Sequence, residues 1–386
     1  MDQSVPASNH KVPYTTIRAI APHPNADRLE VAVVYGFQVV VQKGKYQVGD
    51  KVLYCPIDSI LPGWLEEKIF PPDSKIKLNK RRVRQIRIRG LASQGMLINL
   101  DDTSPIWYKV GFPENWKIES DLADALGITK YEPPEVGPAR TPGGPRKVKK
   151  DENPFFHKYN GLDNIKWYPD KFKPEEQVVL QEKIHGTNAR AACMPYVANT
   201  LWRKVKKYFG FAPAYEFCYG SNNVQLQNKD GHTGFYGEDV YGRMFKKIGV
   251  EDVLKPGETI FGEIYGDGIQ KNYTYGCMPG EHKFVLFDVK VLLENGDQKW
   301  LSPDEVKAFA WERGFDMVPE VYRGPFISLD FVKAYTLGNS VLCPDQKVRE
   351  GVVVKSLDNY DEFGNKRALK VISEVYLDDP TNTDNH

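Results

Sequence analysis

The segment "EKIHGTN", residues 182 to 188, places Lys183 beside a histidine, a glycine and two small polar residues. A lysine amine acts as a nucleophile only when it is unprotonated. At a reference pKa near 10.4, roughly 1 lysine in 2500 is neutral at pH 7, so a nucleophilic Lys183 needs a pocket that lowers its pKa. Lysine followed three residues later by glycine is common by chance, and this segment alone favours a surface charge.

Later segments add carboxylates, cations and aromatic rings in a fixed order. They are "YGSNN" at 219 to 223, "FGEIYG" at 261 to 266, "FVLFDV" at 284 to 289, "REGVVVK" at 349 to 355 and "RALKVI" at 367 to 372. Together with "EKIHGTN" they resemble nucleotidyltransferase motifs I, Ia, III, IIIa, IV and V of the ATP-dependent RNA ligases. DNA ligases and mRNA capping enzymes belong to the same superfamily. The resemblance extends from about residue 155 to residue 375.

The resemblance implies a covalent mechanism. Lys183 attacks the α-phosphorus of ATP to form lysyl-AMP, the adenylate passes to a nucleic-acid 5′-phosphate, and a 3′-hydroxyl then attacks the adenylylated end. Lys355 and Lys370 are the cations expected to lower the pKa of Lys183, helped by Mg²⁺ or Mn²⁺. By resemblance Glu350 is the metal-side carboxylate, and Glu263 binds the ribose or a second metal ion.

The resemblance also assigns the nucleotide contacts. Glu182 is expected to read the adenine amino group, and Phe287 is expected to stack on adenine, with Phe284 as the substitute. The expected nucleotide-binding residues are Glu182, Ile184, Gly186, Asn188, Arg190, Glu263, Phe287, Lys355 and Lys370.

Two motifs depart from the family pattern. Motif Ia has Ser221, Asn222 and Asn223 where many relatives have an arginine, for which Arg190 is a possible replacement. Motif V keeps only Lys370 of its usual lysine pair, unless Lys366 or Arg367 supplies the second cation.

The strand pattern of motif IV raises a geometric question. Period-two alternation puts Glu350 and Lys355 on opposite faces of one strand. Both reach one pocket only if the strand twists or bulges, and Gly351 is the expected place for that.

Residues 17 to about 100 are typical of a small β-barrel, because short alternating runs are separated by turn residues. The segment "PHPNADRLEV", residues 22 to 31, resembles the opening of OB-fold RNA-binding domains attached to tRNA synthetases. Residues 75 to 89 contain eight cations and no acid, which indicates either a solvated face or a surface that binds the phosphates of a nucleic-acid backbone. Ile86 and Ile88 are expected to face inward, with Arg87 and Arg89 facing outward.

Besides residues 75 to 89, a second segment is a candidate for nucleic-acid contact. "LWRKVKKYFG", residues 201 to 210, combines cations with aromatic rings, although a solvated helix with apolar anchors explains it equally well. The expected nucleic-acid contacts are Arg87, Arg89, Lys80, Arg82, Lys204 and Lys207.

The expected fold is α+β, with an N-terminal OB-fold β-barrel followed by an ATP-grasp-like nucleotidyltransferase domain of antiparallel sheets flanked by helices. The expected divisions are a barrel at 1 to 130, a Pro/Gly-rich basic linker at 131 to 153, a transferase domain at 154 to 376 and a disordered tail at 377 to 386. Helices are expected at 120 to 127, 199 to 209, 303 to 313 and 329 to 336. An OB domain placed before the transferase domain resembles the fifth family of RNA ligases.

Composition indicates an ordinary soluble protein, with 52 basic and 51 acidic residues and 41% hydrophobic residues. No apolar run approaches the roughly 20 residues that span a bilayer, and the first residues do not resemble a signal peptide, so we expect a cytoplasmic or equivalent intracellular protein and no membrane partner. The five scattered cysteines favour neither disulfides nor a zinc site. A monomer is expected.

The sequence therefore predicts an ATP-dependent RNA ligase that joins 3′-hydroxyl and 5′-phosphate ends at nicks in duplexes with RNA on the hydroxyl side. One alternative is another covalent nucleotidyltransferase, either a DNA ligase or a capping enzyme. A second is an OB-containing RNA-binding protein whose transferase domain is inactive, an alternative that the incomplete motif V keeps open.

Overall fold

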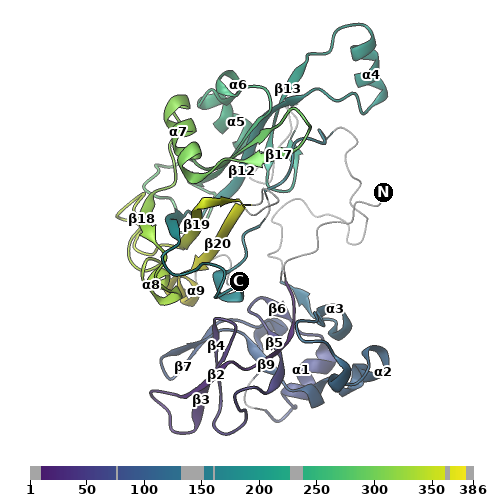
Figure 1. The fold of residues 1–386 in the computed structure, drawn as a ribbon, viewed down its shortest axis with the longest axis vertical. Helices are drawn as coiled ribbons and strands as arrows, with labels where there is room; N and C mark the ends of the chain where they lie inside the picture. Colours follow the sequence, from purple (N-terminus) through teal and green to yellow (C-terminus); the bar gives the residue numbers. More distant parts are fainter. Residues whose placement is uncertain are drawn as a thin grey trace.

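The computed structural model describes residues 10–74, 77–131, 152–159, 161–226, 238–360 and 366–379, with the side chains of 358–360 left aside. Figure 1 shows two bodies, which we call the N-terminal barrel (residues 10–131) and the two-sheet region (residues 152–379). Most of the expected linker and the last residues of the expected tail lie outside the described residues. Within the described residues, no helix has both the length and the apolar character needed to cross a membrane.

The N-terminal barrel is built from short antiparallel sheets with strand orders β1-β5-β9, β2-β3-β4, β7-β8 and β10-β6. Its strands are β1 (Tyr14–Thr16), β2 (Ala19–Pro22), β3 (Leu29–Val34), β4 (Phe37–Gln42), β5 (Lys51–Cys55), β6 (Ser59–Ile60), β7 (Ile86–Ile88), β8 (Leu91–Ser93), β9 (Met96–Ile98) and β10 (Thr129–Lys130). In β4 the alternation is clear, because Phe37, Val39 and Val41 are buried while the residues between them are more exposed.

A helical layer covers one side of the barrel and shares a core with β1, β5 and β9. Its elements are α1 (Gly63–Ile69), η1 (Asn79–Arg81), η2 (Leu100–Ile106), α2 (Trp107–Val110), η3 (Pro113–Asn115) and α3 (Ala123–Leu126). α3 ends at Gly127, whose φ of 73° is a left-handed value that glycine adopts at low cost.

The expectation for Ile86 is wrong. Ile86 is 54% exposed, and among the described residues β7 pairs only with β8, in a two-stranded sheet. Arg87 and Arg89 are exposed as expected.

The two-sheet region consists of two antiparallel sheets. The first has the order β18-β11-β19-β20, and the second has the order β14-β13-β12-β15-β16-β17. The strands are β11 (Gln177–Lys183), β12 (Thr187–Pro195), β13 (Tyr215–Ser221), β14 (Gln225–Leu226), β15 (Glu258–Gly266), β16 (His282–Leu292), β17 (Gln298–Trp300), β18 (Glu320–Pro325), β19 (Gly351–Tyr360) and β20 (Lys366–Ile372).

Helices flank these sheets, as expected for an α+β fold. They are η4 (Ile165–Trp167), α4 (Leu201–Tyr208), α5 (Val240–Lys247), α6 (Val250–Val253), α7 (Pro303–Arg313), α8 (Leu329–Ala334) and α9 (Glu374–Asp378). α5 and α7 bury apolar side chains against one face of the second sheet, and α8 packs against the first. The helices expected at 120 to 127, 199 to 209, 303 to 313 and 329 to 336 correspond to α3, α4, α7 and α8.

Local sequence explains the clearest of these helices. α7 begins with a capping box, in which the Ser302 side chain accepts from the Glu305 backbone N–H and the Glu305 side chain accepts from the Ser302 backbone N–H. It ends before Gly314, which has a φ of 72°.

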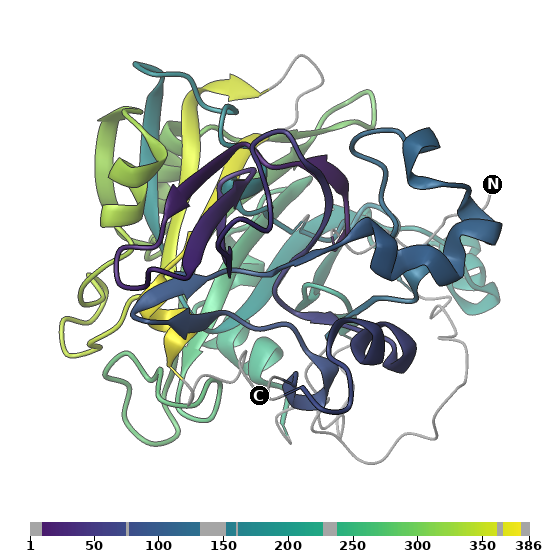
Figure 2. The same cartoon turned by 90° about the horizontal axis from the view of Figure 1, so that it is seen from below.

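Seen from below, the N-terminal barrel lies in front of the yellow strands β19 and β20 (Figure 2).

Candidate active site between the two sheets

Lys183 is the last residue of β11, and the segment after it carries the chain from the first sheet to the second. The Lys183 side chain is 29% exposed, and its Nζ atom lies 2.5 Å from Oε1 of the buried Glu350. Lys183 therefore lies where the two sheets meet, with a carboxylate in contact with its amine.

Motif IV reaches this place without a bulge at Gly351. Glu350 precedes the first residue of β19, so the alternation of the strand does not apply to it. The pairing of β11 with β19 runs without a shift from Val178 opposite Ser356 to Lys183 opposite Gly351. The expectation of a bulge at Gly351 is therefore wrong, and a twist there stays a prediction. A Cβ atom at Gly351 would lie 2.1 Å from the carbonyl oxygen of Val371, so glycine there permits close approach of β20.

Lys370 is the second cation near the nucleophile. It lies on β20 opposite Val353, on the face of the first sheet that carries Lys183. Burial lowers the pKa of Lys370, and the charge of Lys183 lowers it further. The predicted lowering of the Lys183 pKa by Lys370 stays a prediction.

Glu263 comes from the second sheet. It pairs with Asn188 across β12 and β15, and its position at the junction brings its carboxylate within electrostatic reach of Lys183 and Glu350. Burial raises the pKa of Glu263 to about 8, while Lys183 lowers it and Glu350 raises it. The Oδ1 atom of Asn188 is buried and has no hydrogen-bond partner among the described residues.

Gly186 explains why motif I contains a glycine at that position. A Cβ atom there would lie 2.3 Å from the Ile264 carbonyl oxygen and 2.8 Å from Cγ of Glu263. Any side chain would push motif I away from the carboxylate of motif III.

Glu182 has one satisfied and one unsatisfied carboxylate oxygen. Its Oε2 atom accepts hydrogen bonds from the backbone N–H groups of Val341 and Leu342, at 2.7 and 3.3 Å. Its Oε1 atom is buried and has no partner among the described residues. A buried carboxylate oxygen without a donor fits the amino group of a purine.

Two apolar side chains expected to bind the nucleotide belong to one cluster. Ile184 is buried and Phe287 is partly buried, and both pack with Val285 and Val318. Phe284 instead packs in the helix-covered core on the other face of the second sheet. The structure therefore favours Phe287 over Phe284 as the aromatic ring near motif I.

Lys355 contacts a different acid from the one near Lys183. Its Nζ atom donates to the Phe287 carbonyl oxygen at 2.6 Å and to Oδ1 of Asp288 at 2.9 Å. It shares a face with Lys183, but four strand positions, about 13 Å, separate the two residues. Its predicted effect on the pKa of Lys183 stays a prediction.

Asp288, which the sequence interpretation did not single out although it follows Phe287 directly, is the buried acid that Lys355 contacts. Lys366 lies 2.5 Å from its Oδ2 atom, and the Tyr159 hydroxyl donates to the same oxygen at 2.7 Å. Arg367 pairs with Glu176. Both candidates for the second motif V cation therefore contact acids away from Lys183.

A family model described as RNA ligase matches residues 176–372, and a model described as an OB-fold domain matches residues 12–100. The chain belongs to the RNA ligase family. Its N-terminal barrel is an OB fold, as the sequence predicts.

Solved structures of the Naegleria gruberi RNA ligase share the fold of this RNA ligase. A variant with ATP and Mn aligns with a TM-score of 0.71 at 19% identity, covering 95% of this chain and 98% of that one. The complex with PPi aligns at 0.69 and 20% identity, covering 96% and 98%. A variant with AMP and Mn aligns at 0.70 and 20% identity, covering 95% and 97%.

His185 occupies a tyrosine-lined position in the ligase. Its Nε2 atom lies 3.2 Å from the hydroxyl of Tyr376 on α9, and its backbone N–H donates to the Tyr275 hydroxyl at 2.8 Å. The His185 Nδ1 atom is 3.7 Å from Oε2 of Glu350. Tyr376 and Tyr275 were missed, since no local pattern in the sequence links them to motif I.

The donor set for a divalent cation is small. Among the residues that the structure describes, no group of three or more His, Cys, Asp or Glu side chains is arranged to hold a metal ion. Glu350 is nevertheless a buried oxygen donor and Glu263 a partly buried one, both within electrostatic reach of Lys183, and the Oε2 atom of Glu350 has no hydrogen-bond partner among the residues that the structure describes. Two carboxylates fit a Mg²⁺ or Mn²⁺ ion that takes its other ligands from phosphates and water.

Arg190 is held by backbone carbonyls in this structure. It donates to the carbonyl oxygens of Ser221 and Phe156, at 2.9 and 2.6 Å, and its guanidinium lies over the Phe156 ring. Burial lowers the pKa of Arg190 to about 10. These contacts fix β13 to the segment around Phe156, and the ribose contact expected for Arg190 stays a prediction.

The residues expected to bind nucleic acid differ in their surroundings. Arg82 is buried and forms an ion pair with Asp58 at 2.6 Å, so the expectation that its side chain contacts nucleic acid at the surface is wrong. Arg87 forms an ion pair with Asp378 of α9 at 2.5 Å. Lys80 and Arg89 are exposed.

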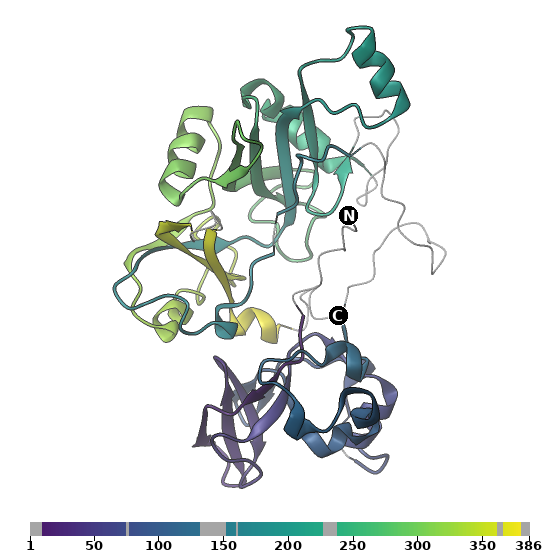
Figure 3. The same ribbon diagram turned by 45° about the vertical axis from the view of Figure 1, so that its right-hand side comes forward.

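Lys204 and Lys207 are exposed on α4, which projects from the two-sheet region (Figures 1 and 3). Arg203 anchors the base of this helix through Glu216 at 2.6 Å. Trp202 and Tyr208 on the same helix are exposed as well. The arrangement is compatible with a nucleic-acid contact at α4, which stays a prediction.

Proposed function

We propose that this chain is an ATP-dependent RNA ligase that seals a 3′-hydroxyl to a 5′-phosphate through a lysyl-AMP intermediate on Lys183. The observation that carries the proposal is the convergence of Lys183, Glu350, Glu263 and Lys370 at one junction between the sheets. The use of ATP is supported by the Naegleria gruberi RNA ligase of the same fold, which binds ATP and Mn.

In the first step the Lys183 amine attacks the α-phosphorus of ATP, the P–N bond forms, and pyrophosphate leaves. In the second step an oxygen of the nucleic-acid 5′-phosphate attacks the α-phosphorus of the lysyl adenylate, the new P–O bond forms, and the P–N bond to Lys183 breaks. In the third step the 3′-hydroxyl attacks the 5′-phosphorus, a phosphodiester bond forms, and AMP leaves.

The residues of the chain have separate tasks in these steps. Lys370 neutralises charge on phosphate oxygens near Lys183, while Glu182 and Phe287 orient the adenine. Glu350 and Glu263 hold the divalent cation, which when bound offsets the negative charge of the phosphates.

We propose that the substrate is a nicked duplex with RNA on the 3′-hydroxyl side. The OB barrel that precedes the ligase domain supports this proposal, because an OB barrel can bind a nucleic-acid strand beside the active site. The exposed cations Lys80 and Arg89 supply phosphate contacts on the barrel. A monomer with one site is sufficient for this reaction.

The test is incubation with α-labelled ATP and Mg²⁺ or Mn²⁺, followed by a denaturing gel. Label is expected on the native protein and on a Lys246→Ala control, which removes an exposed lysine of α5, and is expected to be absent from Lys183→Ala. Label in the Lys183→Ala protein would assign the nucleophile elsewhere, and absence of label from all three would support an inactive transferase domain. A panel of nicked duplexes with RNA or DNA on the 3′-hydroxyl side then identifies the acceptor.

A further inference from the structure

A short segment of the two-sheet region is attached to both domains. Asn164 forms a parallel bridge with Lys370 of β20, and the Lys370 backbone N–H donates to the Asp163 carbonyl oxygen at 2.9 Å. Asn164 also caps η4 by accepting a hydrogen bond from the Lys166 backbone N–H. The start of η4 is thus fixed to the strand that carries a predicted catalytic lysine.

The end of η4 packs into the barrel. The Trp167 ring lies 5.0 to 5.4 Å from the rings of Tyr35, Phe37 and Tyr54, measured between centroids. Aromatic pairs at these separations stabilise a contact beyond the area they bury. Trp167 therefore joins an aromatic cluster whose other members belong to the OB fold.

The backbones of the two domains also touch at this point. The Gly36 N–H donates to the Lys166 carbonyl oxygen at 2.7 Å. A Cβ atom at Gly36 would lie only 3.0 Å from Cα of Lys166 and 3.1 Å from its carbonyl oxygen. The contact thus requires a residue without a side chain on the barrel.

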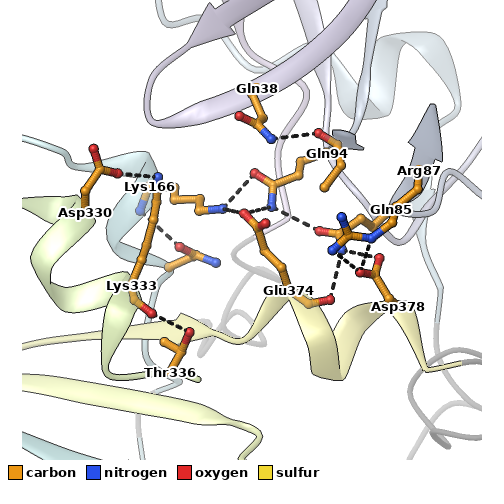
Figure 4. Close-up of polar contacts among 12 residues, drawn as sticks. Gln38, Gln85, Arg87, Gln94, Lys166, Asp330, Lys333, Thr336, Glu374 and Asp378 are labelled. Carbon is orange, nitrogen blue, oxygen red and sulfur yellow. Dashed lines mark hydrogen bonds and ion pairs between the residues drawn. The ribbon is translucent and has the colours of Figure 1, made fainter. Parts of the chain in front are cut away.

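Beside Trp167, a buried lysine forms the centre of a polar network between the domains (Figure 4). The Lys166 side chain donates to Oε1 of Gln94 on the barrel at 2.7 Å and lies 3.5 Å from Oε1 of Glu374 on α9. Gln94 in turn donates to Oε1 of Glu374 at 3.3 Å and to Oε1 of Gln85 at 3.0 Å. Burial of a lysine is costly unless it is hydrogen-bonded, so this network indicates one specific docked arrangement.

The network continues along α9 towards the active site. Gln85 and Arg87 of the barrel both contact the Asp378 carboxylate, at 2.8 and 2.5 Å. Between Glu374 and Asp378, Tyr376 faces the other way and contacts His185 of motif I. α9, drawn yellow in Figure 3, therefore touches the barrel on one side and motif I on the other.

We propose that Lys166 and Trp167 are positioning residues that hold the OB barrel against β20 and α9, so that an RNA end bound by the barrel meets the lysyl adenylate. This inference rests on the proposed function. The side-chain contacts described for Lys166 and Trp167 are with the barrel and α9, so we expect formation of the covalent adenylate not to need them and transfer of AMP to the nucleic-acid end to need them.

The test separates these two steps in the full-length chain. Variants Lys166→Met, Trp167→Leu and Gly36→Leu each damage the docking contact in a different way, and Trp167→Phe preserves an aromatic ring. Arg18→Met is the matched control, because Arg18 pairs with Asp170 across the same interface at 3.6 Å but both side chains are exposed. Thermal unfolding of each variant identifies any that do not fold.

We expect label transfer from α-labelled ATP to stay within about threefold of the wild-type rate in all variants. In a single-turnover chase, preformed protein–AMP is mixed with a nicked RNA duplex. We expect the three disruptive variants to transfer AMP at least about tenfold more slowly than wild type, and Trp167→Phe and Arg18→Met to transfer it within about threefold of wild type.

Equal transfer rates in wild type and in the folded disruptive variants would overturn the proposal. Equal losses in both steps would also overturn it, because the contact would then support the nucleotide site itself. If wild type forms no covalent adenylate, the proposed function fails instead, and that outcome is read from the first step alone.

Discussion

The amine of Lys183 lies 2.5 Å from the carboxylate of Glu350, although 167 residues separate them in the chain. The pair forms because β11 ends opposite the start of β19, which places the end of one motif against the beginning of another. A buried carboxylate in contact with the expected nucleophile defines the centre of the candidate site.

Glu350→Gln is expected to lower the rate of label transfer from ATP to protein by about 100-fold or more, because it removes a negative charge that serves both Lys183 and a divalent cation. The measurement is the initial rate of protein labelling at saturating ATP and Mn²⁺. Glu312→Gln, an exposed carboxylate of α7, is the control and should leave the rate unchanged. If Glu350→Gln labels at the wild-type rate, Glu350 does not bind the metal ion.

Glu182→Gln is expected to raise the KM for ATP by about tenfold, since a charged acceptor for the adenine amino group becomes neutral. The two backbone contacts to Val341 and Leu342 can be kept by the amide oxygen, so folding should be little affected. Labelling rates measured against ATP concentration give the KM. An unchanged value would show that the free oxygen of Glu182 does not face the base.

Gly186→Ala is expected to destabilise the protein by about 1 to 3 kcal/mol and to reduce labelling, because the new methyl group would overlap the Ile264 carbonyl and displace Glu263. Urea denaturation measures the free energy of unfolding. Gly161→Ala is the control, since a Cβ atom at Gly161 would have no described atom within 4 Å apart from those of its chain neighbours. Equal free energies of unfolding for the two variants would show that motif I shifts to accommodate the methyl group without a loss of stability.

The lowered pKa of Lys166 predicts that the free energy of unfolding depends on pH. Burial lowers its pKa to about 8, while Glu374 and Asp330 raise it and Lys333 lowers it. Between pH 8 and the unfolded value of 10.5 the unfolded chain binds more protons at this residue than the folded chain does, so its contribution to stability rises with pH. The free energy of unfolding of wild type should increase by about 1 kcal/mol from pH 8 to pH 9 relative to Lys166→Met. Parallel curves for the two proteins would contradict the lowered pKa.

Arg89→Ala is expected to weaken binding to a nicked duplex and to reduce the slope of log Kd against log salt by about 1, because an exposed cation next to a phosphate releases one counterion. Arg87→Ala removes a side chain that already pairs with Asp378, so its effect on the salt slope should be smaller. Binding titrations at several salt concentrations measure both. A slope unaffected by Arg89→Ala would show that the turn between β7 and β8 is only a solvated surface.

The sequence by itself determined the family, the identity of the candidate nucleophile and most element types. These features depend on local information: motif order, period-two runs, and caps such as Ser302 and Gly314 at the ends of α7. A capping residue or an alternating strand acts on neighbours within a few positions, so its effect can be predicted without knowing the fold.

Only the tertiary structure decided which partner each charged side chain meets. Lys355 meets Asp288, Lys366 joins the same carboxylate, Arg82 is buried against Asp58, and Tyr376 reaches His185. Lys166 and Trp167 carry no local sign that they dock the barrel. These contacts join segments that are distant in sequence, and their energy depends on burial and geometry that exist only after the sheets and the barrel have packed.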